Sequence, residues 1–370
     1  MKRVLAGALL IACSPSPVVP DGGVCGLSLA QFPAADSIFQ NDSSWIGADA
    51  AYSVDLGNTR VLWLFGDTFI AKDAARSRSS SWFIRNSVAI QSGSTDPSSS
   101  SAKIAFAWKT TPTSMGPAAS SFFPESGAHW FWPLSGVRLP SRLVLFLLEE
   151  SQTGQGAFGF QAVGTKVVFV TNPDADPSSW NVTAGNLPTF AFPIAFGAAV
   201  VHDEAFVYAF GDAEPGDHSV YVARFDAATL DSGDASSPVF FDKGSWTAAG
   251  SSPPPAIFPS GSALDNPPTE FSVHKRADGT WLAVHSIGFG ATKIAVRTAP
   301  APAGPWTSPC AVFTPPEATR SNILEYAAKA HPELQTGPPG SLVITYATNS
   351  TDLSTIANDM TVYFPRFVRQ

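Results

Sequence analysis

The sequence predicts an all-β fold, a five-bladed β-propeller, and three observations support this prediction. The chain has 32 Pro and 29 Gly among 370 residues, with 12% aromatic and only 14% charged residues. This composition is typical of many buried strands joined by turns. No segment has a convincing helical period, and the best helical candidate, Ser321 to Ala330, is short. Finally, a pair of strands separated by a turn recurs five times along the chain.

The recurring unit is a strand that begins with small or polar residues, then a turn, then a very apolar strand. The apolar strands are centred roughly 60–80 residues apart, which leaves room for about two more strands in each interval. Four strands repeated radially form one propeller blade. The five units are 47–56 with 60–67, 130–139 with 143–148, 196–201 with 205–210, 270–275 with 281–285, and 327–334 with 342–346.

Further strands are needed to complete the blades and to close the ring. The tail at 360–368, or the segment before Gly47, would have to complete one blade. A β-sandwich or a two-domain β protein is the alternative that the pattern leaves open. The additional strands are expected at 86–91, 166–170, 219–225 and 293–297.

The N-terminus has the features of a bacterial lipoprotein signal. Residues 1–3 are basic at two positions, residues 4–12 form an apolar run, and Leu-Ile-Ala precedes Cys13. We expect residues 1–12 to be removed, Cys13 to be lipidated, residues 13–40 to form a tether, and residues 41–370 to form the propeller. The apolar run is too short for a membrane-spanning helix, so only the lipid would contact the membrane of the cell envelope. The alternative is a weak start with an incidental cysteine.

The charge of the chain limits its partners. Without Lys2 and Arg3 the net charge is about −10, which argues against nucleic acids and anionic lipid surfaces. The pair Glu149 and Glu150 follows an apolar strand and is expected at a solvated edge.

Two cysteines remain after Cys13. Cys25 and Cys310 could form one disulfide in an oxidising compartment, or could be two free thiols. We expect a monomer without an organic cofactor.

Three acidic residues occupy related positions in the hairpins. If the first turn is centred on Asn58, Asp49 and Asp67 are each nine residues away and lie opposite each other at the open end. The same reflection in the third unit places Asp212 near Ala195. Two neighbouring carboxylates shift each other's pKa in a way that suits acid–base hydrolysis. The alternative for Asp67 is a turn cap.

Other candidates lie where strands enter the centre of the propeller. Glu270 opens the fourth unit, and Lys329 and His331 share one face of the fifth. His331 could instead be a satisfied core histidine. Trp130 and Trp132 could stack on sugar rings or could belong to the blade core.

Several of these segments resemble a bacterial family described as a domain of unknown function. The resemblance covers residues 40–350, and its most specific part is 45–50 with 62–68 and 85–87; 269–272 and 326–334 resemble later signatures. Members are similar to five-bladed propeller glycoside hydrolases of the arabinanase and xylosidase type, and some relatives are endo-D-arabinanases.

The resemblance implies that the chain acts on a polysaccharide or oligosaccharide, such as a furanoside, with acidic residues around the central funnel. Asp49 would be the base or nucleophile, Glu270 the acid, and Asp67 the residue that orients them. From their positions in the repeated units, rather than from the resemblance, Asp212, Lys329, His331, Trp130 and Trp132 are expected to contact the substrate. His331 would lie near a bound cation, Ca²⁺, in the funnel. The alternative is a non-catalytic propeller that binds glycan or protein at the cell surface.

Overall fold

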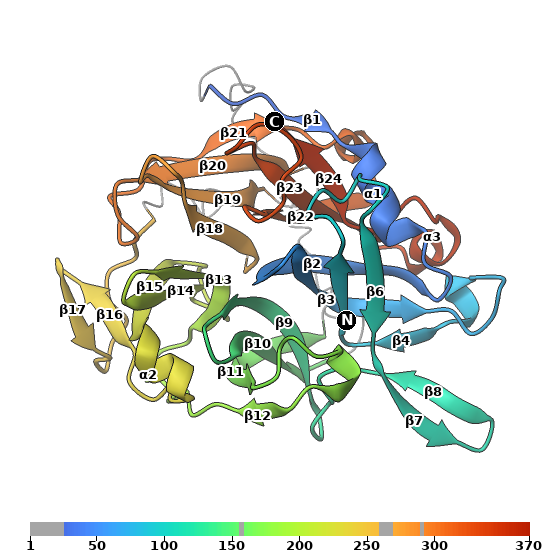
Figure 1. Ribbon diagram of the computed structural model, residues 1–370, viewed down its shortest axis with the longest axis horizontal. Helices are drawn as coiled ribbons and strands as arrows, with labels where there is room; N and C mark the ends of the chain where they lie inside the picture. Colours follow the sequence, from blue (N-terminus) through green and yellow to red (C-terminus); the bar gives the residue numbers. More distant parts are fainter. Residues whose placement is uncertain (1–25, 155–158, 259–268, 289–291) are drawn as a thin grey trace, which may run out of the picture.

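The protein is a closed ring of five small antiparallel sheets (Figure 1). The computed structural model describes residues 26–154, 159–258, 269–288 and 292–370. The first strand of each blade in chain order faces the centre and contacts the first strands of the neighbouring blades. The predicted five-bladed β-propeller is therefore confirmed, and the sandwich and two-domain alternatives are excluded.

The blades follow one another along the chain. Blade 1 contains β2 (Trp45–Gly57), β3 (Arg60–Ile70), β5 (Ser87–Ser92) and β6 (Lys103–Ala107), with β4 (Trp82–Ile84) paired to β3. Blade 2 contains β9 (His129–Arg138), β10 (Leu143–Gln152), β11 (Phe160–Val170) and β12 (Val182–Ala184). Blade 3 contains β13 (Ala195–Asp203), β14 (Phe206–Asp212), β15 (Val220–Asp226), β16 (Val239–Asp242) and β17 (Ser245–Ala248).

Blade 4 contains β18 (Phe271–Lys275), β19 (Trp281–Ile287), β20 (Lys293–Ala299) and β21 (Cys310–Phe313). Blade 5 contains β22 (Ile323–Ala330), β23 (Val343–Ser350), β24 (Arg366–Arg369) and β1 (Ala30–Gln31).

The remaining elements are short. A hairpin of β7 (Lys109–Thr113) and β8 (Gly116–Ser120) projects from the ring, and the helices are α1 (Pro33–Gln40), α2 (Ala227–Ser232) and α3 (Leu353–Asn358). Among the described residues, no helix has the length and apolarity to cross a membrane.

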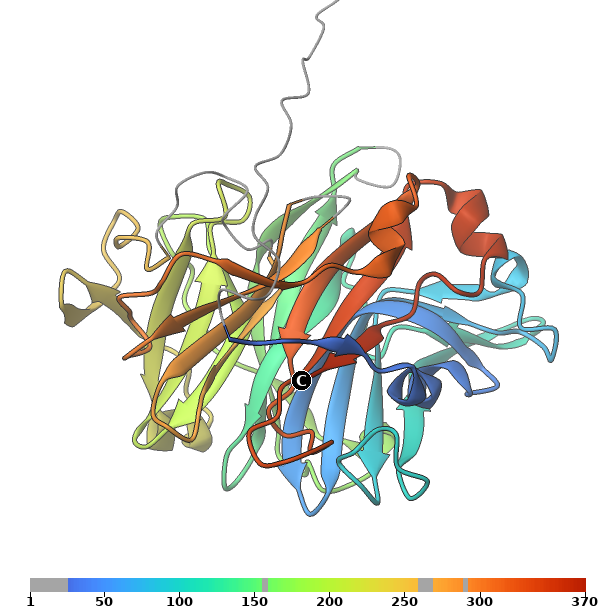
Figure 2. The same ribbon diagram turned by 90° about the horizontal axis from the view of Figure 1, so that it is seen from above.

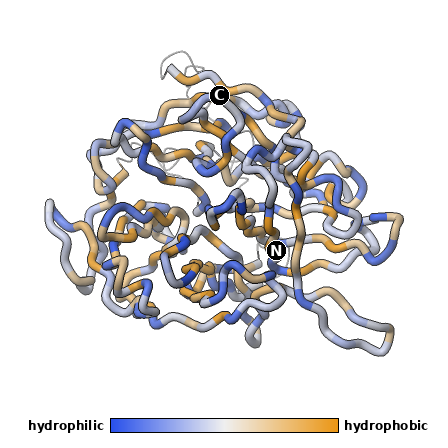
Figure 3. Tube along the Cα trace, viewed as in Figure 1, coloured by the Kyte–Doolittle hydropathy of each residue, from blue (hydrophilic) through white to orange (hydrophobic). Residues whose placement is uncertain are grey.

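Burial on both faces explains why the second strand of each unit is so apolar. The five residues from Val61 to Phe65 on β3 are all fully buried, because the blades stack face to face around the ring. Apolar segments recur along the strands of every blade (Figure 3), and in the side view the strands of neighbouring blades run alongside one another (Figure 2). Burial of this apolar surface is the main term that stabilises the fold.

The two ends of the described chain meet in blade 5. Ala30 pairs with Arg369 and Gln31 with Val368, so β1 adds the outer strand beyond β24. Both segments expected to close the ring therefore take part. The folded domain begins before residue 41, since β1 and α1 belong to it rather than to the tether, and the Phe39 ring stacks on Phe367 at 5.3 Å.

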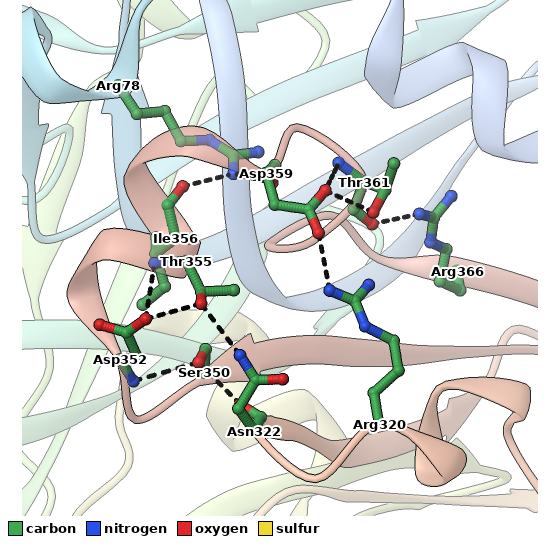
Figure 4. Close-up of polar contacts among 10 residues, drawn as sticks. All are labelled: Arg78, Arg320, Asn322, Ser350, Asp352, Thr355, Ile356, Asp359, Thr361 and Arg366. Atoms are coloured by element: carbon green, nitrogen blue, oxygen red, sulfur yellow. Dashed lines mark hydrogen bonds and ion pairs between the residues drawn. The ribbon is translucent and has the colours of Figure 1, made fainter.

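The loop between β23 and β24 fastens blade 5 to blade 1 (Figure 4). The buried Arg78 donates to the carbonyl oxygens of Ile46, at 2.8 Å, and Ile356, at 3.0 Å. Arg320 forms an ion pair with Asp359 at 2.7 Å in the same loop. The Arg78 contacts hold the loop against the start of β2, and the ion pair holds it against the segment that precedes β22.

Gly47 is required for this close approach. Its φ is +136°, and a Cβ atom there would lie 2.5 Å from the carbonyl oxygen of Tyr363 and 2.7 Å from Nη2 of Arg78. The Tyr363 hydroxyl in turn donates to the carbonyl oxygen of Asp67 at 3.2 Å. The loop therefore reaches the hairpin that carries the predicted acids.

Two other predictions concern local structure. The helical candidate Ser321 to Ala330 is wrong, because most of it forms β22, which pairs with β23 and packs at the centre of the ring. Cys310, at the start of β21, is disulfide-bonded, whereas Cys13 and Cys25 lie outside the described residues.

Candidate active site

The first hairpin places Asp49 beside Gly66 and Asp67, as its spacing predicts. Ala48 pairs with Thr68 and Ala50 with Phe65, with bulges on either side of Asp49. A Cβ atom on Gly66 would lie only 2.5 Å from Oδ1 of Asp49. Gly66 thus makes room for the neighbouring carboxyl group of Asp49.

Asp49 is half-buried and has one strong hydrogen-bond donor. The Tyr326 hydroxyl donates to Oδ2 of Asp49 at 2.7 Å, and Asn349 donates to the Tyr326 hydroxyl oxygen at 3.0 Å. Burial, and then the negative charges of Asp67 and Glu270, raise the pKa of Asp49 to about 8. At pH 7 this carboxyl group is therefore mostly protonated.

Asp67 keeps more of its negative charge. Burial raises its pKa to about 6, against the opposing effects of Arg85 and Trp132. The Trp132 indole N–H donates to Oδ1 at 2.9 Å, and Arg85 donates to Oδ2 at 3.3 Å. Its side chain retains 16% exposure, so solvent reaches it.

Glu270 forms an ion pair with Lys329 across the boundary between blades 4 and 5. Nζ of Lys329 lies 2.6 Å from Oε2 of Glu270, and the Lys329 side chain is fully buried whereas that of Glu270 is 22% exposed. Burial lowers the pKa of Lys329, although the Glu270 charge counteracts this effect. The ammonium also lies over the Tyr52 ring, 4.3 Å from its centroid.

The structure brings Asp49, Asp67, Glu270 and Lys329 together at the centre of the ring. The charges of Asp67, Glu270 and Lys329 all act on Asp49. Strands from blades 1, 4 and 5, more than 250 residues apart at the extremes, supply these groups. Residues that are distant in the sequence therefore form one mixed-charge cluster.

One of the other predicted residues, His331, has mainly structural contacts. His331 is 1% exposed, and its ring nitrogens lie 2.5 Å from the Ser53 hydroxyl and 2.7 Å from that of Thr345. Burial lowers its pKa to about 3. Because both nitrogens are engaged, His331 does not fit a cation site, and Ca²⁺ bound through it is not supported.

The two tryptophans differ in accessibility. Trp130 is 5% exposed, and the Arg85 guanidinium covers one face of its ring at 4.2 Å from the centroid. It belongs to the core rather than to a surface for stacking sugars. Trp132 is half-buried beside Asp67, so its contact with substrate stays a prediction.

A second carboxylate cluster lies in blade 3, and the sequence signalled only part of it. Asp212 pairs with Ala195 at the open end of the hairpin, as expected, and is fully buried. Around it lie Glu214 and His218, from the loop between β14 and β15. Neither residue stood out in the sequence, because their short spacing in a loop has no periodic signal.

Glu150 was expected at a solvated edge, and this expectation is wrong. The residue is 2% exposed, and burial, together with the charges of Glu214 and Asp67, raises its pKa to about 8. It lies on β10 opposite Trp130. The folded ring covers its side chain, which its position at the end of an apolar run could not indicate.

The geometry suits proton-transfer chemistry at a polar bond. One carboxyl group, Asp49, is mostly protonated at neutral pH. A second, Glu270, forms an ion pair with Lys329 and lies close enough for its charge to raise the pKa of Asp49. A neutral acid beside an ionised carboxylate is the pairing that general acid–base hydrolysis requires.

Comparison with solved structures supports the architecture. A proposed hydrolase from Bacteroides ovatus has a TM-score of 0.73 and 17% identity over 92% of this chain and 89% of its own. An exo-β-1,3-galactanase from Phanerochaete chrysosporium has a TM-score of 0.51 and 13% identity over 93% and 63%. The catalytic domain of a GH62 α-L-arabinofuranosidase from Coprinopsis cinerea gives 0.48 and 11% over 89% and 92%.

The first two of these structures share their fold with the chain, at identities that show the fold alone. No curated protein sequence matches it. The sequence profile of one family matches residues 34–370, which includes every blade. The chain therefore belongs to the family described as "Domain of unknown function (DUF5005)".

Proposed function

We propose that the protein is a glycoside hydrolase that acts on a polysaccharide or oligosaccharide, with a furanoside as the first candidate. One observation carries the proposal, namely that Asp49, Asp67 and Glu270 converge at the centre of the ring with Lys329. Structures of similar fold include a galactanase and an arabinofuranosidase, which makes glycans the first substrates to test.

The charges favour the reverse of the roles expected from the sequence. Asp49, with a pKa of about 8, is the proton donor to the leaving oxygen, because it is protonated at neutral pH. Glu270 is the ionised carboxylate that activates water or attacks the anomeric carbon, because Lys329 stabilises its negative charge. Asp67 raises the pKa of Asp49 through its charge and so keeps the proton in place.

Two measurements test the activity and the participation of both acids. Purified protein is incubated with arabinan, arabinogalactan, β-1,3-galactan and xylan, and the released reducing ends are measured. On any hydrolysed glycan, Asp49→Asn and Glu270→Gln should each lower kcat/KM by about 10²–10⁴-fold. Asp55→Asn, at the exposed end of the same strand as Asp49, is the matched control and should keep full activity. Absence of hydrolysis by wild-type protein, or activity that survives both substitutions, would contradict the proposal and favour a binding function.

A substrate with a good leaving group tests which of Asp49 and Glu270 is the proton donor. A 4-nitrophenyl glycoside of the sugar that the screen identifies needs little protonation of its leaving oxygen. Asp49→Asn should therefore regain much of its activity on this substrate, whereas Glu270→Gln should remain inactive. The opposite pattern would restore Glu270 as the acid and Asp49 as the base.

We also propose that the protein is exported and held in the bacterial cell envelope by a lipid on Cys13, and that it acts there as a monomer. The signal in residues 1–13 supports the anchor. Intact-mass analysis of protein from membranes should show a diacylated N-terminal cysteine, and Cys13→Ser should release the protein from the membrane fraction. Light scattering after removal of the anchor checks the monomer.

A further inference from the structure

We infer that the blade 3 cluster is a binding site for a divalent transition-metal ion, with Zn²⁺ or Mn²⁺ as the fitting ions. The cluster consists of Asp212, Glu214 and His218. This site is separate from the pair Asp49 and Glu270, and the inference does not depend on the proposed hydrolysis.

The three residues of blade 3 already have the separations of ligands around one metal ion. Nδ1 of His218 lies 3.0 Å from Oδ2 of Asp212 and 3.3 Å from Oε2 of Glu214. One ligand atom from each of the three residues lies within 4.8 Å of the other two. Ligands bound at about 2.1 Å to one tetrahedral or octahedral ion lie roughly 3.0–3.4 Å apart.

Unpartnered buried oxygens are the second, independent observation. The side chain of Asp212 is fully buried, and its Oδ1 atom has no hydrogen-bond partner. Oε2 of Glu150, on a residue that is 2% exposed, also has none. A buried carboxylate oxygen without a donor is costly. A cation held by the cluster would give Oδ1 of Asp212 a partner.

Glu150 adds a second buried carboxyl group near the cluster, from blade 2. The charge of Glu214 is the largest charge effect on Glu150, so the two carboxyl groups are neighbours across the boundary between blades 2 and 3. On the other side, the Thr269 hydroxyl donates to Oε2 of Glu214 at 3.4 Å. An ion bound by the cluster would therefore lie where blade 3 meets blades 2 and 4.

The chemistry of the donors selects the class of ion. Ca²⁺ and Mg²⁺ favour sites made only of oxygen ligands, whereas an imidazole nitrogen suits Zn²⁺ and other transition metals. Carboxylates together with one imidazole are common ligands of Zn²⁺ and also suit Mn²⁺. His218 is 39% exposed and Glu214 22%, so an ion can enter from solvent without unfolding.

Isothermal titration calorimetry of untagged, metal-free protein with ZnCl₂, MnCl₂ and CaCl₂ tests the inference. We expect one saturable site for Zn²⁺ or Mn²⁺, much weaker binding of Ca²⁺, and a higher thermal midpoint in the metal complex. His218→Ala should weaken the affinity at least tenfold, and Asp212→Asn should do the same. His202→Ala, at an exposed histidine on the same blade, is the matched control and should leave the affinity unchanged.

Pulsed electron paramagnetic resonance of the Mn²⁺ complex provides a direct readout. A coupling to an imidazole nitrogen should be present in wild-type protein and absent in His218→Ala. The inference is overturned if neither Zn²⁺ nor Mn²⁺ binds stoichiometrically, or if His218→Ala and Asp212→Asn, both folded by circular dichroism, bind as tightly as wild-type protein.

Discussion

The two parts of the candidate active site hold their carboxyl groups in opposite ways. In blade 1, Asp49 and Asp67 face each other on one hairpin, and burial with like charge favours the neutral form of Asp49. At the boundary between blades 4 and 5, Glu270 faces a buried ammonium, and its charge is compensated by Lys329. One ring can therefore hold a neutral carboxyl group near a charge-compensated carboxylate, because each has a different neighbour. Asp49 lies near another acid, and Glu270 lies beside a lysine.

The largest expected effect concerns the buried ion pair. Glu270→Gln leaves Lys329 buried without its counter-ion and should lower the free energy of unfolding by about 3–5 kcal/mol. Asp49→Asn replaces a group that is mostly neutral in the folded protein at pH 7 but ionised in the unfolded chain, and it should not lower the free energy of unfolding. Urea unfolding at pH 7 measures both.

A double variant checks the cause of this loss. Glu270→Gln with Lys329→Met removes both charges and should recover most of the stability. A double variant as unstable as Glu270→Gln alone would show that packing, not the unpaired charge, is responsible.

The next effect tests how blade 1 depends on ring closure. Gly47→Ala places a Cβ atom 2.5 Å from the carbonyl oxygen of Tyr363 at a φ of +136°, so the loop that reaches Asp67 must move. We expect a loss of about 2–3 kcal/mol in the free energy of unfolding, with lower activity. Gly57→Ala is the control, since its φ is +77° but no atom lies within 4 Å, and it should cost only about 1 kcal/mol.

The pH dependence of stability tests the protonation state of Asp49 in blade 1. A carboxyl group whose pKa is raised from 3.8 to about 8 on folding contributes stability that is complete below pH 4 and is lost as the pH rises through about 8. The free energy of unfolding of wild-type protein should therefore fall between pH 4 and pH 8. The share of Asp49 in this slope is at most about 1.4 kcal/mol per pH unit.

Asp49→Asn isolates that share. The variant should show a shallower fall over the same range and should exceed wild-type protein in stability at pH 9. Equal slopes for the two proteins in urea titrations at pH 5, 7 and 9 would show that Asp49 is ionised in the folded state.

The smallest expected effect concerns the partner of Asp67. Trp132→Phe removes the indole donor 2.9 Å from Oδ1 and should raise the pKa of Asp67 above about 6. The loss of a hydrogen bond to a partly charged group should cost about 1–2 kcal/mol at pH 8 and less at pH 5, where Asp67 is protonated. Trp82→Phe, on the neighbouring strand β4, is a control without this contact. A cost that is the same at both pH values would contradict the assignment.

The sequence by itself determined the repeated hairpins and the pairs of residues within them. The spacing about Asn58 was enough to place Asp49 beside Asp67, and the same reflection placed Asp212 opposite Ala195. These relations are local, since an antiparallel register follows from the position of the turn. The burial of the second strand of each unit could also be predicted, because its residues are almost all apolar.

Only the tertiary structure decided which distant groups meet and in which protonation state. The pairing of Glu270 with Lys329, the burial of Glu150 and the engagement of both His331 nitrogens depend on side chains from other blades. Ring closure likewise joins β1 to β24 across almost the whole chain. Burial and charge act through space, so residue spacing along one strand could identify the acids of this site but not their roles.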